Sequence, residues 1–169
     1  SRELLADLGI TNVTVSGDTR FDRVKALVDA NDALPIAAAF RKATSHPVLV
    51  AGSTWPKDET IIAEALKLLG RPIRTLVVPH ELGTAQLDAI ERSFQGPVVR
   101  WTAIETELAA SLPPGRDPSV PPDEDSLSAP TLLVDRMGLL SRLYKYADIT
   151  YVGGGFGPGI HNTLEAAAW

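Results

Sequence analysis

Short apolar runs alternate with segments of helical periodicity along almost the whole of this 169-residue chain. Strands that are apolar on both faces are typical of parallel sheets, because helical crossovers cover both sides of such a sheet. The apolar runs lie at 13–15, 48–50, 76–78, 98–99, 132–134 and 149–152, and helical spacing recurs at 21–28, 61–69, 87–94 and 139–144. The sequence therefore predicts an α/β fold with a Rossmann-like, doubly wound parallel sheet.

Residues 1–169 are expected to form a single domain, because the alternation resumes after the irregular segment 112–130. That segment holds six of the 13 prolines and the acidic run Asp123-Glu124-Asp125. Proline neither continues a helix nor donates a hydrogen bond to a central strand, so we predict a surface loop that is partly disordered. Helical patterns at 1–8 and at the last residues suggest that the chain is a piece of a larger protein.

The loops that follow the predicted strands are the candidate binding positions, because open parallel sheets bind ligands at the carboxyl ends of their strands. These loops contain Ser53 and Thr54, His80, the stretch Met137, Gly138 and Leu139, and the glycines Gly154 and Gly155. Ser53 and Thr54 would either cap the next helix or contact a ligand. His80 is either structural or a ligand contact, and Gly138 would let a base or phosphate approach the backbone.

The loop after 149–152 is the strongest candidate, since five of the seven residues from Gly153 to Gly159 are glycine. Its spacing fits neither the dinucleotide pattern Gly-x-Gly-x-x-Gly nor a Walker loop, so NAD or ATP sites of these kinds are not expected. Backbone N–H groups of the loop, and of a helix that starts near His161, would instead bind a phosphate or carboxylate. The plain alternative is a tight turn packed under a neighbour.

Polar residues just after the glycines complete this candidate site. Glu165, one turn into the expected helix, would accept hydrogen bonds from a ribose diol. Asn162 would cap the helix or contact the ligand. His161 and Glu165 supply only two of the ligands of a usual zinc sphere, so no metal is expected. Neither a Gly-x-Ser-x-Gly elbow nor a triad is evident, and no catalytic residue is assigned.

The composition narrows the class of partner. A net charge of −5 argues against a nucleic-acid surface, which needs clustered Lys and Arg. There is no cysteine, which excludes disulfides and thiolate sites. No stretch of the sequence approaches the roughly 18 apolar residues of a membrane span. A small anionic ligand in one positive pocket remains compatible with these properties.

Five short motifs occur in a fixed order along the chain. They are Val15-Ser16-Gly17-Asp18-Thr19-Arg20-Phe21-Asp22, Ala51-Gly52-Ser53-Thr54-Trp55-Pro56, Val78-Pro79-His80-Glu81, Leu143-Tyr144-Lys145-Tyr146-Ala147-Asp148, and Val152-Gly153-Gly154 followed by His161-Asn162-x-Leu164-Glu165. Together they resemble the 3-deoxy-D-manno-octulosonic acid (Kdo) transferase family. The resemblance covers nearly the whole chain, and the second and last motifs in combination are specific.

This resemblance implies the C-terminal, donor-binding half of a GT-B glycosyltransferase, an enzyme with two Rossmann-like domains around a cleft. The donor would be CMP-Kdo, without a further cofactor, and the acceptor a lipid A precursor in the lipopolysaccharide biosynthesis of a Gram-negative bacterium. The parent protein would act at the cytoplasmic face of the inner membrane. Its N-terminal acceptor domain, with the catalytic carboxylate, is absent here, so the fragment alone is expected to be inactive.

The same resemblance assigns donor contacts to residues after four strands. They are Ser53, Thr54, His80, Met137, Gly138, Leu139, Gly154, Gly155, His161, Asn162 and Glu165. Asn162 and Glu165 match best: Glu165 would bind the ribose hydroxyls, and the backbone from Gly155 to Asn162 the phosphate. Two positions depart from the family, because Pro79 replaces an arginine and Leu139 replaces a glutamate. Each departure removes one charged contact.

Two other functions stay open. A different GT-B enzyme that uses a UDP-sugar, such as an epimerase or a hexosyltransferase, would share the glycine loop and Glu165. A noncatalytic α/β interaction module, in which the loop is only structural, is the alternative from another class. Titration with CMP, UMP and UDP would distinguish the three.

Overall fold

The computed structural model of this chain describes residues 2–111, 127–157 and 159–169, and its centre is a five-stranded sheet. The strand order is β3-β4-β2-β1-β5, and every neighbouring pair is parallel. The strands are β1 (Val48–Thr54), β2 (Arg74–Pro79), β3 (Val98–Arg100), β4 (Thr131–Leu133) and β5 (Ile149–Val152). The predicted Rossmann-like α/β fold is confirmed, and it is consistent with one half of a GT-B glycosyltransferase.

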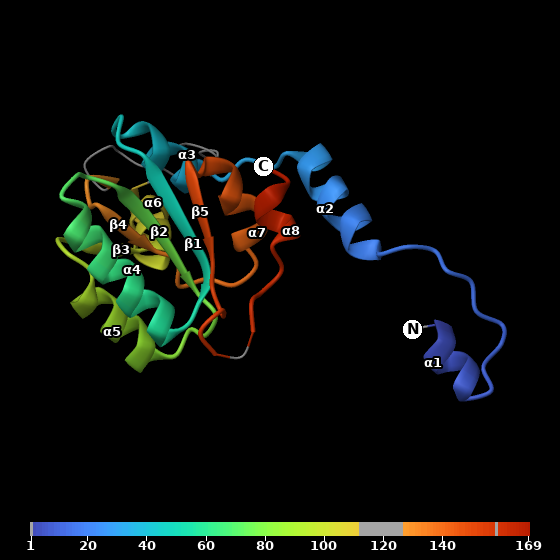
Figure 1. Cartoon of the computed structure of the whole chain (residues 1–169). Helices are drawn as coiled ribbons and strands as arrows, with labels where there is room; N and C mark the ends of the chain where they lie inside the picture. The colour runs from blue at the N-terminus through green and yellow to red at the C-terminus, as the bar shows by residue number, and fades with distance from the viewer. Residues whose placement is uncertain (1, 112–126, 158) are drawn as a thin grey trace.

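Helices cover both faces of this sheet (Figure 1). α4 and α5 pack on one face and α3, α6 and α7 on the other, as two clusters of buried side chains show. Side chains alternate along β2, so that Leu76 joins the α3 side and Val77 joins the α4 side. The helices are α1 (Arg2–Asp7), α2 (Thr19–Ala30), α3 (Pro35–Lys42), α4 (Pro56–Leu69), α5 (Thr84–Ser93), α6 (Trp101–Ser111), α7 (Leu140–Leu143), the 3-10 helix η2 (Tyr144–Tyr146) and α8 (Leu164–Ala167).

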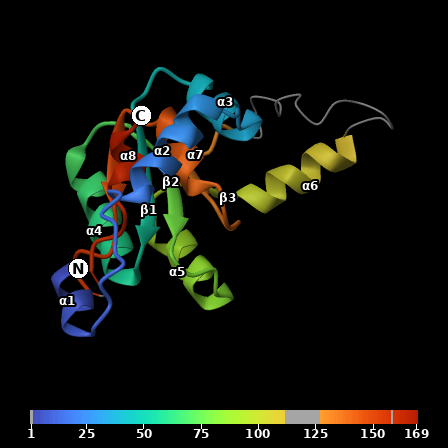
Figure 2. The ribbon, with the colours of Figure 1, turned by 90° about the vertical axis from the view of Figure 1, so that its right-hand side faces the viewer.

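Two helices, α3 and α6, have no counterpart in the predicted pattern. α3 begins with Pro35, which suits the first turn of a helix, and buries Ile36 and Phe40. α6 buries Trp101 and Ile104 against the same cluster, and its far end reaches beyond the sheet (Figure 2). Its apolar spacing is present in the sequence but falls next to the proline-rich segment. None of the described helices has the length and apolar composition needed to cross a membrane.

The first part of the chain lies outside the core. No described residue before Leu34 is buried, and α1 stands away from the sheet (Figure 1). The predicted strand at 13–15 is wrong: these residues have no regular structure, and Val15 is 72% exposed. A run of β-branched residues forms a strand only where it finds a partner and a surface to cover, and this run has neither. α2 is helical as predicted, but Phe21 is 60% exposed, and the helix contacts α8.

The predicted surface loop at 112–130 is wrong in its last part, at residues 127–129. Residues 112–126 of this prediction lie outside the described residues. Leu127 and Ala129 are buried rather than at the surface. The guanidinium of Arg74, itself only 3% exposed, donates to the backbone carbonyls of Phe40, Leu127 and Ala129. It also lies 3.7 Å from the centre of the Phe40 ring. A buried cation therefore holds this segment against α3, and composition alone does not reveal such a contact.

Replacing Arg74 is expected to destabilise the fold strongly. In Arg74→Met the carbonyls of Phe40, Leu127 and Ala129 lose their donor while they stay buried, which costs about 2–4 kcal/mol of the free energy of unfolding. Urea unfolding measures the change. Arg71→Met is the control, because Arg71 is exposed three residues earlier and is expected to change stability by less than about 0.5 kcal/mol. Equal effects of the two substitutions would contradict this role.

Candidate functional site

The loops after β1, β2, β4 and β5 lie at one edge of the sheet, because all strands run in the same direction. β1 has β2 on one side and β5 on the other. After β1 the chain forms β2, β3 and β4 on one side of β1, and only the last strand, β5, lies on its other side. This reversal of strand order is a topological switch point, the place where open α/β sheets bind ligands. The ends of β1 and β5 therefore form the centre of the candidate site.

These two strand ends are in direct backbone contact. The N–H of Gly153 donates to the carbonyl of Gly52 at 2.8 Å. A Cβ atom added to Gly153 would lie 2.3 Å from the carbonyl oxygen of Ser53, so only glycine fits there. Ser53 has a φ of 51° where the register between β1 and β2 shifts, as in a β-bulge. The bulge places the half-buried Ser53 side chain at the edge beside β5.

The glycine loop, residues 153–161, folds back on itself. The N–H of Gly159 donates to the carbonyl of Gly154 at 3.1 Å, and the N–H of His161 donates to that of Gly153 at 3.2 Å. The predicted helix start near His161 is wrong, because its N–H group is already used inside the loop. α8 begins only at Leu164.

The glycines of this loop differ in what the fold requires of them. Gly154 has a φ of 95°, and an added Cβ would lie 2.2 Å from the carbonyl oxygen of Gly159. A side chain is therefore excluded at Gly154. At Gly155 and Gly157 the backbone is not left-handed, and an added Cβ would meet no atom within 4 Å. The tight-turn explanation accounts for Gly154, whereas Gly155 and Gly157 leave bare backbone beside open space.

Three rings from three different loops stack beside the glycine loop. The ring centre of His80 lies 4.6 Å from that of Trp55 and 4.5 Å from that of His161. The indole Nε1 of Trp55 donates to Nε2 of His161 at 3.1 Å. The structure thus brings together two predicted histidines and a tryptophan that the sequence pattern did not indicate. Within the described part of the chain, no group of three or more His, Cys, Asp or Glu residues could hold a metal ion.

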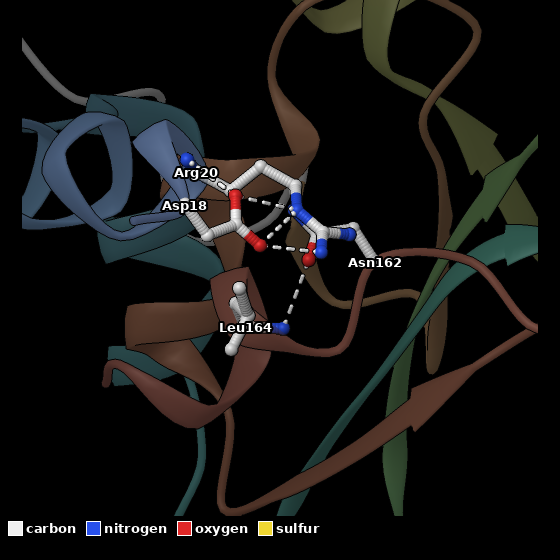
Figure 3. Close-up of polar contacts among 4 residues, drawn as sticks. All are labelled: Asp18, Arg20, Asn162 and Leu164. Carbon is white, nitrogen blue, oxygen red and sulfur yellow. Dashed lines mark hydrogen bonds and ion pairs between the residues drawn. The ribbon is translucent and has the colours of Figure 1, made fainter. Parts of the chain in front are cut away.

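Asn162 lies just before α8 (Figure 3), and Glu165 is in the first turn of this helix. Oδ1 of Asn162 accepts from the N–H of Leu164 at 3.1 Å, and its Nδ2 lies 3.4 Å from Oε1 of Glu165. Figure 3 also shows the exposed ion pair of Asp18 and Arg20 at the start of α2. Hydrogen bonds from Arg20 lower the pKa of Asp18 to about 2. The N-cap position of α8 is Thr163 rather than Asn162, but Asn162 accepts the first N–H of the helix from one residue earlier, and its amide group lies beside Glu165.

Tyr144 connects Glu165 to the central strand. The Tyr144 hydroxyl occupies the space in front of Gly52, where an added Cβ would lie 2.2 Å from it. Burial, helped by the negative charge of Glu165, raises the pKa of Tyr144 well above its ordinary value. Glu165 is itself half-buried, and its Oε1 lies beside the amide of Asn162.

Thr54 is directed into the protein rather than toward the edge. Its side chain is fully buried, and its hydroxyl donates to Oε1 of Glu59 at 3.0 Å. The same oxygen accepts from the amide of Gln86 at 3.0 Å. The Thr54 hydroxyl is therefore committed to an internal acceptor, and of the two predicted hydroxyl residues Ser53 is the accessible one.

The β4 loop contributes Met137, Gly138 and Leu139 at the other end of the edge. Met137 is exposed, and Gly138 has a φ of 83° with open space around it. A pocket of about 440 Å³ opens beside Leu139. Its lining consists of Leu34, Pro35, Ile36, Trp101, Glu105, Leu108, Ala109, Arg136 and Leu139. The pocket depends on α3 and α6, the two helices missing from the predicted pattern, and so was not predicted.

Asp58 and Glu59 are adjacent buried carboxylates in the first turn of α4, and their pKa values shift in opposite directions. Burial alone would raise the pKa of Asp58, but hydrogen bonds from the Tyr151 hydroxyl and the N–H groups of Gly154 and Trp55 lower it below its ordinary value. For Glu59, burial dominates and raises the pKa. Asp58 is a residue of this site that the sequence analysis did not identify.

A parallel sheet with helices on both faces and polar residues in the loops at its carboxyl edge defines a Rossmann-like α/β domain. The chain is distantly similar to proteins named 3-deoxy-D-manno-octulosonic acid transferase from Rickettsia bellii and Rickettsia felis, with 27% identity over 166 and 169 residues. The aligned regions cover 95% of this chain in both cases, and 34% and 31% of the relatives.

A bifunctional glycosyltransferase/methyltransferase from Fusobacterium nucleatum is 28% identical over 119 residues, which cover 70% of this chain and 16% of that protein. No protein-family model matches the chain. The chain spans about a third of the length of the Rickettsia relatives. These similarities support a relationship to glycosyltransferases at low identity.

Alanine at two neighbouring glycines is expected to have opposite consequences for stability. Gly154→Ala places a Cβ against the backbone at a left-handed position and should lower the free energy of unfolding by about 2 kcal/mol or more. Gly155→Ala meets no atom and should change it by less than about 0.5 kcal/mol. Thermal unfolding of the two variants checks this. A larger loss for Gly155→Ala than for Gly154→Ala would show that the loop has a different conformation.

Because the pKa of Glu59 is raised, we expect the substitution Glu59→Gln to increase the free energy of unfolding in a pH-dependent way. Because the folded pKa lies above the unfolded one, ionisation of Glu59 lowers stability as pH rises through the folded pKa. Glu59→Gln keeps an acceptor for Thr54 and Gln86 without the charge. The variant should be more stable than the natural chain at pH 7, and the difference should disappear near pH 4. Urea unfolding across this range measures it, with Glu64→Gln, an exposed carboxylate of α4, as the control.

Proposed function

We propose that this chain binds CMP-Kdo as the C-terminal, donor-binding half of a Kdo transferase of the GT-B type. The complete enzyme would transfer Kdo to a lipid A precursor at the cytoplasmic face of the inner membrane, in lipopolysaccharide biosynthesis. The observation that carries the proposal is the gathering of Ser53, His80, His161, Asn162 and Glu165 at the topological switch point. The names of the two Rickettsia relatives support the choice of sugar.

The dimensions of the edge suit a sugar nucleotide. Neighbouring strands lie about 4.8 Å apart, so the ends of β5 and β4, three positions apart, are separated by about 14 Å. The phosphate would bind near the bare backbone at Gly155. The base would lie at Gly138, next to the pocket beside Leu139, which has the volume of an ordinary small-molecule site.

The ribose would lie between these two ends, where Glu165 is held. α8 contacts η2, which follows the β4 loop, so Glu165 is placed between the glycine loop and that loop. Its carboxylate accepts a long contact from Asn162 and has capacity for further donors, such as the hydroxyl groups of a ribose. A carboxylate that accepts hydrogen bonds from a diol uses charge-assisted contacts, which are stronger than neutral ones.

Titration of the chain with CMP, UMP and UDP tests the donor. We expect CMP to raise the melting temperature more than UMP or UDP at equal concentration, because a ligand that binds only the folded state stabilises it in proportion to its affinity. Glu165→Ala should weaken CMP binding by about tenfold or more, since hydrogen bonds to a charged acceptor are lost. Glu64→Ala, at an exposed position of α4, should leave CMP binding unchanged.

The other two functions predict different results in this titration. Stronger binding of UDP than of CMP would favour a UDP-sugar enzyme. If no nucleotide shifts the melting temperature and Glu165→Ala changes nothing, the donor site is refuted and an interaction module is favoured.

A further inference from the structure

The carboxylate of Asp58 lies at the junction of three segments of the candidate site. Oδ2 accepts from the N–H of Trp55 at 2.9 Å and from the N–H of Gly154 at 3.0 Å. Oδ1 accepts from the hydroxyl of Tyr151 at 2.6 Å. Asp58 is only 1% exposed, so these contacts are made away from solvent. One side chain thus joins the start of α4, the end of β5 and the first turn of the glycine loop.

We propose that Asp58 is a positioning residue: its two carboxylate oxygens fix the glycine loop in the conformation that binds the anionic part of the donor. The inference rests on the proposed donor site for its functional meaning. It goes beyond that site, because Asp58 is 1% exposed and its carboxylate oxygens accept from groups of the protein itself.

The geometry of the loop supports this role. Gly154 is buried, is left-handed at φ 95°, and accepts the N–H of Gly159 at its carbonyl. The hydrogen bond from the N–H of Gly154 to Asp58 connects the glycine loop to α4. The next residue, Gly155, is exposed. A shift of the Gly154 peptide would therefore move the backbone at Gly155, where the phosphate is proposed to bind.

The requirement is for the acceptor positions rather than for the charge. The three partners of Asp58 are donors as drawn, but a tyrosine hydroxyl can also accept. In Asp58→Asn the amide oxygen would keep both N–H contacts, and the amide nitrogen would donate to the Tyr151 oxygen after rotation of the hydroxyl. In Asp58→Ala all three contacts are lost. Since the Asp58 charge lies beneath a proposed anion site, its removal with the geometry intact should not weaken binding of an anion.

The test combines two measurements on the full chain: amide hydrogen exchange at Gly154, and affinity for CMP. Asp58→Ala should speed exchange at Gly154 and weaken CMP binding, each by about tenfold or more, as expected for loss of a buried charge-assisted contact. Asp58→Asn should keep both within about threefold of the natural chain, or bind CMP more tightly. Glu59→Gln, a change at the neighbouring buried carboxylate, is the matched control and should leave Gly154 exchange unchanged.

The outcomes separate the two proposals. If Asp58→Ala leaves Gly154 exchange as in the natural chain, or if Asp58→Asn behaves like Asp58→Ala, the positioning role is overturned. If the natural chain binds no CMP while Gly154 exchange still rises only in Asp58→Ala, the donor site is refuted and the positioning of the loop stands. Should Asp58→Ala fail to fold, Tyr151→Phe removes a single donor, and unchanged exchange at Gly154 in that variant would overturn the role equally.

Discussion

The close approach of β5 to β1 is the constraint on which the candidate site depends. It requires glycine at position 153, because a Cβ there would collide with the Ser53 carbonyl, and glycine at position 52 makes room for the Tyr144 hydroxyl over β1. With these two glycines in place, the strands pair through Val152 and the glycine loop leaves the sheet directly beside the start of α4. The rings of Trp55, His80 and His161 then stack across loops that are far apart in the sequence, and the carboxylate of Asp58 accepts the N–H of Gly154 in the glycine loop.

The two adjacent carboxylates of α4, Asp58 and Glu59, are both buried, but the pKa of Asp58 is lowered and that of Glu59 is raised. Asp58 receives three donors, of which two are backbone N–H groups fixed by the fold, so that its charged form is favoured despite burial. Glu59 receives only side-chain donors from Thr54 and Gln86, and burial outweighs them. The difference follows from position: Asp58 faces the start of its own helix and the glycine loop, whereas Glu59 faces α5. An ionised Asp58 fits a structural anchor of the loop.

The five strands of the sheet were predictable because their signals are local and strong. Uninterrupted apolar runs flanked by glycine or polar residues account for β1 to β5, and the common edge follows from their parallel direction. The failures have a common physical cause. The run at 13–15 has β propensity but no partner, α3 and α6 are identified by tertiary burial more than by periodicity, and Leu127 is buried through Arg74, which lies 53 residues earlier. Each depends on a contact between distant segments.

In the candidate site, too, features that depend on local contacts were predictable, whereas those that depend on contacts between distant segments were not. The hydrogen bond that Asn162 accepts at the start of α8 was predictable in kind, since it is a local interaction between a side chain and the N–H two residues on. The commitment of Thr54 to Glu59 and the ring stack were not, because both depend on how α4 is oriented over the sheet. Asp58 is the clearest case: in the sequence it is an acidic residue in the first turn of a helix, which is a common and sufficient reason for its presence. Only the position of β5 beside β1 gives the same carboxylate a second set of donors, and this second set is what turns a helix-capping residue into a candidate determinant of loop conformation.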